Sequence, residues 1–129
     1  MMILQRDFLK ICRSGTEEEI VQAVEAGVNL NVKNKAGATG LMFAAQSNTA
    51  DAIEILVKAG ADVNAQDVHG NTALIYAASY NDEAAVDVLL EGGADIAIKN
   101  NEGYTASDYV GRNYRISDID TVRNLVNVE

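Results

Sequence analysis

The stretch Gly70-Asn-Thr-Ala-Leu74 decides the fold, because it has counterparts 33 residues before it and 33 residues after it. The counterparts are Gly37-Ala-Thr-Gly-Leu41 and Gly103-Tyr-Thr-Ala-Ser107. A second motif, Ala59-Gly-Ala-Asp-Val-Asn64, repeats at the same spacing as Ala26-Gly-Val-Asn-Leu-Asn31. A period of this size in 129 residues indicates stacked repeats, each burying its apolar face against the next.

The repeat divides the chain into units that form one domain. Numbered from Met1, the units are 1–33, 34–66, 67–99 and 100–129. The end units depart most: the first lacks the turn Gly and Thr, and the fourth has Val110-Gly111 in place of an Ala-Ala pair. Helical spacing returns at Ile119 and Val122. We therefore expect both ends to be capping repeats, the last with a final helix, and the chain to be a complete array.

Each unit should hold two short helices. In the third unit, Thr72 is the expected N-cap of a helix over 73–79, because its hydroxyl can accept a hydrogen bond from the first turn. A second helix over 83–91 carries apolar residues at i, i+3 and i+4 spacing and should end at Gly92-Gly93 in a left-handed cap. Between the helices, one position holds Gly15, Asn48 and Asn81, which predicts a helix stop at positive φ.

Two further features are interpreted as core. Cys12 takes the position of an alanine in the internal Ala-Ala pair, so we expect a small buried group and not a reactive thiol. Phe43, Tyr76 and Tyr109 share one position of the first helix, which predicts an interlocking aromatic column more readily than a ligand platform.

The whole chain resembles ankyrin repeats. The family signature Thr-Pro-Leu-His-x-Ala corresponds to Thr39-Gly-Leu-Met-Phe-Ala44 and Thr72-Ala-Leu-Ile-Tyr-Ala77, and Ile53-Glu-Ile-Leu-Val-Lys-Ala-Gly-Ala-Asp-Val-Asn-Ala65 matches its second helix and hairpin. The resemblance implies an all-α repeat solenoid, a stack of helix-turn-helix-hairpin units with N- and C-terminal capping repeats. It also implies a protein-binding function.

The chain departs from the family pattern at two positions. It contains no proline, so the signature proline becomes Gly40, Ala73 and Ala106. The signature histidine, which usually ties neighbouring turns together, becomes Met42, Ile75 and Asp108. We expect apolar packing to carry more of the stability. Alanine in place of proline and the compact, self-capped form favour a bacterial member of the family.

Composition narrows the functional class. No apolar run approaches the length of a membrane span, and the N-terminus meets charge too early for a secretory signal. A net charge of −9 disfavours nucleic acid and anionic lipid as partners. One cysteine allows no internal disulfide, which is compatible with a reducing cytoplasm. We expect a cytoplasmic protein without a membrane or nucleic-acid partner.

Candidate catalytic groups are few. The chain has one histidine and one cysteine, so most nucleophile, base and metal sets are unavailable. His69 falls at a predicted hairpin tip, where no cysteine or second histidine can join it on a metal. Asp118 and Asp120 are two residues apart on the predicted last helix and do not face each other. We expect no enzyme activity, cofactor or metal.

Recognition of a partner is the remaining function. In the family, partners dock on the hairpin tips and on the exposed flank of the first helices, which form a concave face. Carried over by position, the contact residues are Arg13, Lys33, Lys35, Gln46, Gln66, Val68, His69, Asn71, Ser79, Tyr80, Lys99, Asn101, Glu102, Tyr104 and Arg112. Most of the acidic residues fall on the second helices, so the expected contact face is neutral to slightly basic.

Tyr80 and Tyr104 are the expected anchors, since tyrosine offers a large and rigid contact; the alternative is that each packs against its own turn. Asp67 has a structural alternative, capping its hairpin turn. The sequence thus predicts a monomeric protein-binding module, with an inhibitor or immunity-type protein as the sharper variant. The rivals are an accessory ligand-binding or enzymatic protein that uses a groove near Tyr80, Tyr104 and His69, and a homodimer formed through the concave face.

Overall fold

A computed structural model describes residues 5–80 and 82–112 of the chain. The described part holds seven helices: three pairs and the first helix of the fourth unit. They are α1 (Gln5–Ser14), α2 (Glu17–Glu25), α3 (Gly40–Ser47), α4 (Ala50–Lys58), α5 (Ala73–Ser79), α6 (Glu83–Glu91) and α7 (Ala106–Arg112). The expected fold class, an all-α repeat solenoid, is confirmed.

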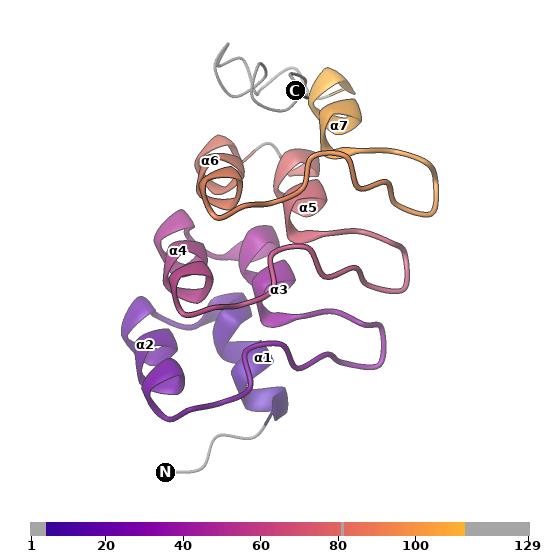
Figure 1. Ribbon diagram of the computed structural model, residues 1–129. Helices are drawn as coiled ribbons and strands as arrows, with labels where there is room; N and C mark the ends of the chain where they lie inside the picture. Colours follow the sequence, from indigo (N-terminus) through magenta and orange to yellow (C-terminus); the bar gives the residue numbers. More distant parts are fainter. Residues whose placement is uncertain (1–4, 81, 113–129) are drawn as a thin grey trace.

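The helices form two layers, with the hairpins to one side (Figure 1). Helices α1, α3, α5 and α7 stack as an inner row, and α2, α4 and α6 stack behind them as an outer row. Each connection from an outer helix to the next inner helix projects away from the rows as a long hairpin. The two helices expected in the third unit have the predicted bounds, and Thr72 is the N-cap, with Oγ1 accepting a hydrogen bond from Ile75 N.

The core lies between the two layers and runs through the stack. Ile53 and Leu56 of α4, and Val86 and Leu89 of α6, are at most 1% exposed. Met42, which stands at the signature histidine position, is also buried in this core. The apolar packing expected at that position is therefore present in α3, as it is in α5.

The fourth unit fills the histidine position differently. Asp108 accepts hydrogen bonds at Oδ2 from Thr105 N and Thr105 Oγ1, at 2.8 and 3.2 Å. Its carboxylate thus stabilises the start of α7, where a negative charge interacts favourably with the helix dipole. The final helix expected around Ile119 and Val122 lies outside the described residues.

Each hairpin turn is held by one side chain at its base. Asp67 Oδ1 accepts hydrogen bonds from His69 N and Asn71 N, at 2.9 and 3.0 Å. Asn34 and Asn100 make the same pair of bonds in their own turns. The structural role considered for Asp67 is confirmed, and the same position acts alike in all three hairpins.

Neighbouring hairpins are also bonded to each other. Val68 N donates to Ala36 O at 2.9 Å, and Asn101 N donates to His69 O at 3.0 Å. The second of these bonds passes beside Gly70, which has φ of +76°. A Cβ at Gly70 would lie 2.8 Å from the Asn101 nitrogen, so the hairpins can approach this closely only at a glycine.

The predicted positive-φ stop between the helices is wrong. Asn48 has an extended backbone, with φ of −121° and ψ of −174°. Its side-chain Nδ2 donates to Cys12 O and Gly15 O, at 2.9 and 3.1 Å, and so joins the second unit to the first. Gly15 is not left-handed either. A Cβ there would lie 2.6 Å from Ile11 O, so close packing accounts for this glycine. Asn81 lies outside the described residues.

The Asn48 bonds can be tested by removing the amide. We expect Asn48→Ala to lower the free energy of unfolding by about 1–3 kcal/mol, because two part-buried carbonyl groups lose their donor. Gln22→Ala, on the exposed side of α2, should change it by less than about 0.5 kcal/mol. Urea denaturation measures both, and equal stability of the two variants would contradict the role assigned to Asn48.

A second test compares two glycines at the same position of the hairpin. Gly103 has φ of +85°, and no described atom lies within 4 Å of a Cβ built on it. Both Gly70→Ala and Gly103→Ala should lower the free energy of unfolding by about 1–2 kcal/mol, because alanine disfavours the positive φ of these positions. Only in Gly70→Ala does the added Cβ clash with the next hairpin, at Asn100 and Asn101. We expect this variant to lower the free energy of unfolding by about 1–3 kcal/mol more than Gly103→Ala. A smaller loss in Gly70→Ala would contradict the close-approach argument.

Candidate protein-binding surface

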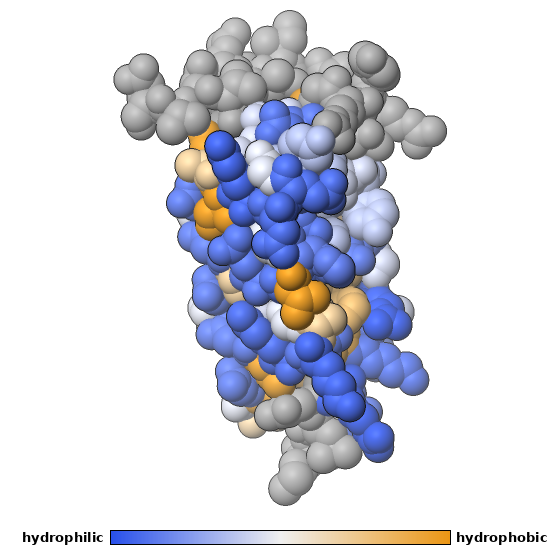
Figure 2. All heavy atoms as spheres, turned by 90° about the vertical axis from the view of Figure 1, so that its right-hand side faces the viewer, coloured by the Kyte–Doolittle hydropathy of each residue, from blue (hydrophilic) through white to orange (hydrophobic). Residues whose placement is uncertain are grey.

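The hairpin residues predicted to contact a partner lie on one side of the molecule. Figure 2 shows the side toward which the hairpins project: it is largely hydrophilic and carries a small apolar area near its middle. Val68 is 56% exposed at the tip of the second hairpin. The other exposed members are Lys33, Lys35, Gln66, His69, Lys99, Asn101 and Glu102. Asn71 is half-buried.

The predicted residues on the helix flank differ in exposure. Arg13 is exposed at the end of α1, whereas Gln46 and Ser79 are half-buried. Tyr80, directly after α5, is 57% exposed. The side chain of Arg112 lies outside the described part of the chain. Among the predicted contact residues, Tyr80 and Val68 are the large hydrophobic side chains that are exposed.

Tyr104 packs against its own repeat. Its ring meets Tyr109 edge to face, with centroids 5.9 Å apart and an interplanar angle of 82°. Tyr109 Oη in turn accepts a hydrogen bond from Asn100 Nδ2 at 2.8 Å. This ring contact supports the structural alternative for Tyr104, which is half-buried, more than that for Tyr80.

Three of the predicted contact residues also bond one hairpin to the next. Gln66 Nε2 donates to Gly70 O and Lys99 O, at 2.9 and 3.3 Å. Asn101 Nδ2 donates to Val68 O at 2.8 Å, and Asn71 Oδ1 accepts from Asn100 Nδ2 at 2.9 Å. The predicted contact positions gave no sign of this structural role, because Lys99 O, Val68 O and Asn100 Nδ2, the partners that make it, belong to a neighbouring hairpin.

The aromatic column lies at the border between the core and the hairpins. Phe43, Tyr76 and Tyr109 are half-buried and pack against the core. Tyr76 Oη donates a hydrogen bond to Asp67 Oδ2. The pKa of Tyr76 is raised, mainly by partial burial and to a smaller extent by this hydrogen bond. Arg13 lies over the Phe43 ring, with Cζ 4.7 Å from the centroid. Each ring thus packs against the core and also contacts a polar or charged side chain, namely Arg13, Asp67 or Asn100.

The charges differ between the two sides. The outer helices and the residue preceding α6 carry a set of acidic residues, namely Glu17, Glu18, Glu19, Glu25, Asp51, Glu54, Asp82, Glu83, Asp87 and Glu91. The hairpins carry Lys33, Lys35 and Lys99 against Asp62, Asp67, Asp95 and Glu102. Much of the negative charge therefore lies behind the inner helices.

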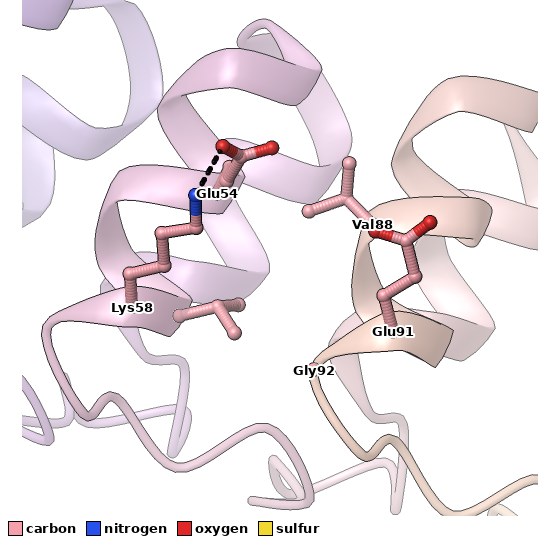
Figure 3. A pocket seen from close by; sticks show the side chains of 6 residues that line it. Glu54, Lys58, Val88, Glu91 and Gly92 are labelled. Carbon is pink, nitrogen blue, oxygen red and sulfur yellow. Dashed lines mark hydrogen bonds and ion pairs between the residues drawn. The ribbon is translucent and has the colours of Figure 1, made fainter.

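Figure 3 shows a hollow on the outer layer, between α4 and α6. Its volume is about 210 Å³, and its residues are Glu54, Val57, Lys58, Val88, Glu91 and Gly92. The Lys58 Nζ–Glu54 Oε1 ion pair, 2.8 Å long, forms one side of it. Two further hollows lie beside α1. None of the three is lined by Tyr80, Tyr104 or His69.

The one cysteine of the chain lies in the core. Cys12 is fully buried, and this burial raises the pKa of its thiol to about 12. Within residues 5–80 and 82–112, no group of three or more His, Cys, Asp or Glu side chains could hold a metal ion. In the same ranges, no helix has the length and apolar character needed to cross a bilayer.

The geometry defines a class of protein, an α-helical solenoid with projecting hairpins. The family model described as Ankyrin repeats (3 copies) matches residues 8–100. The match covers most of the 129 residues, so the chain belongs to the ankyrin-repeat family. No curated protein matches the chain.

The state of Cys12 has a direct test. Its thiol should stay protonated at pH 8 and react with a thiol reagent only when the protein unfolds. The folded pKa lies above the ordinary value of 9.0. The protonated thiol therefore contributes its whole share to the free energy of unfolding below pH 9.0, and this contribution falls as the pH rises toward about 12. Absorbance assays with and without denaturant measure the reaction, and rapid labelling of the folded protein would contradict the assignment.

Proposed function

We propose that this protein is a non-catalytic binding module, which presents its hairpin tips and inner-helix flank to a protein partner. The family supports the general role, because ankyrin repeats generally mediate protein–protein interaction. The observation that carries the proposal is the combination of fixed hairpins with exposed apolar side chains at Val68 and Tyr80.

Rigidity makes such a surface useful. The bonds between hairpins connect Ala36 with Val68, and His69 with Asn101. A surface held in this way loses little backbone freedom on binding, so more of the contact energy appears as affinity. Val68 and Tyr80 then supply apolar area, and the polar residues around them supply specificity.

The sharper form of the proposal is an inhibitor or immunity-type protein, which acts by covering part of its partner. We also propose a monomer in the cytoplasm. A single cysteine, buried in α1, is compatible with a reducing compartment. No hollow described above favours the rival ligand-binding or enzymatic role, since none includes Tyr80, Tyr104 or His69.

The proposal is tested by affinity capture from a lysate of the native host, with quantitative mass spectrometry. Val68→Asp with Tyr80→Ala removes the two exposed apolar contacts, so recovery of the specific partner should fall at least about tenfold. Val21→Asp is the control, because Val21 is 37% exposed on the outer helix α2. It should recover the partner as the wild type does.

Circular dichroism must show both variants folded. Equal recovery by the double variant would refute the assigned surface. Loss of recovery in Val21→Asp alone would place binding on the outer helices.

A further inference from the structure

Three basic residues share one side of α1. Arg6, Lys10 and Arg13 are three or four residues apart, a spacing that places them on the same helix face. All three side chains are exposed, whereas Phe8 and Cys12 on the opposite side are fully buried. The first inner helix therefore presents a cationic stripe to solvent.

The first hairpin adds two more cations beside this stripe. Lys33 and Lys35 are exposed and flank Asn34. Asn34 lines a hollow together with Arg6, Leu9, Lys10, Arg13 and Phe43. We call Arg6, Lys10, Arg13, Lys33 and Lys35 the basic cluster. It occupies the N-terminal end of the face that carries Val68 and Tyr80 farther along the stack.

Within the described residues, no carboxylate forms an ion pair with a residue of the basic cluster. The ion pair found there joins Lys58 and Glu54, on the outer helix α4. Two acidic residues neighbour Lys10 without forming an ion pair with it in the described structure: Asp7 stands three residues before it on α1, and Glu19 lines a second hollow together with Lys10. Asp67, on the next hairpin, is occupied by its own turn and by Tyr76. Five cations thus remain together on a protein whose net charge is −9.

The hollow inside the cluster combines positive charge with an apolar floor. Its volume is about 300 Å³, and Leu9 and Phe43 supply apolar surface. Arg13 is already oriented, with its guanidinium 4.7 Å from the Phe43 ring centroid and its carbonyl accepting a hydrogen bond from Ser47 Oγ at 2.9 Å. This arrangement suits one apolar side chain flanked by carboxylates.

We propose that the basic cluster binds an acidic segment of the partner protein, with Asp and Glu carboxylates on the cluster and one apolar side chain in the hollow. The inference rests on the proposed function and names the chemistry of the partner. A polypeptide fits better than a nucleic acid, because a phosphate backbone carries no apolar group that could pack on Leu9 and Phe43 at the floor of the hollow. A long polyanion would also be repelled by the acidic outer helices.

The test uses fluorescence anisotropy with a short labelled peptide of glutamates around one central leucine. Wild-type protein should bind it, and binding should weaken as the salt concentration rises. Lys33→Ala with Lys35→Ala should weaken binding about tenfold. Lys58→Ala with Gln22→Glu changes the net charge equally but lies on the outer helices and leaves the cluster intact, so it should bind as the wild type does.

The remaining probes separate the alternatives. A peptide in which serine replaces the leucine should bind more weakly, since the hollow then stays unfilled. Tighter binding of a single-stranded oligonucleotide than of the acidic peptide would overturn the proposal. So would equal loss of peptide binding in the two double variants. Partner capture that depends on Val68 and Tyr80 but not on Lys33 and Lys35 would overturn this inference while leaving the proposed function intact.

Discussion

The close approach of neighbouring hairpins is the constraint on which the surface of this protein depends. Gly70 permits it, because any side chain there would meet Asn101. The approach allows Asn101 N to bond His69 O, and the equivalent bond joins Val68 N to Ala36 O. Since each hairpin is also tied at its base by Asn34, Asp67 or Asn100, the tips form one continuous surface. The exposed side chains between these bonds are thereby held in fixed relative positions.

The two-layer arrangement then sorts the charges. The second helix of each pair stands in the outer row (Figure 1). These outer helices carry many of the carboxylates. The cations of α1 and of the first hairpin belong instead to the inner row and the hairpins. An acidic protein can for this reason offer a basic surface to a partner, and net charge alone is a poor guide to what it binds.

Local signals predicted the repeat accurately, but they failed where one residue serves two units. Thr72, the helix at 73–79 and the burial of Cys12 follow from neighbours along the chain, and the structure confirms them. The predicted left-handed stop at Asn48 is wrong, because the side chain of Asn48 bonds the carbonyls of Cys12 and Gly15, which belong to the preceding unit. Gln66 and Asn101 showed the same gap: their positions are those of contact residues, yet both bond a neighbouring hairpin.

The 33-residue period by itself determined the class of fold, the order of the elements and the side on which the hairpins lie, because a repeat that cannot bury its own apolar face must stack. Only the tertiary structure decided which exposed residues remain available. Tyr80 and Tyr104 look equivalent in the sequence, but Tyr104 rests on Tyr109 whereas Tyr80 is 57% exposed. The grouping of α1 with the first hairpin into one basic cluster was likewise decided in space, since Arg13 and Asn34 line one hollow from different elements.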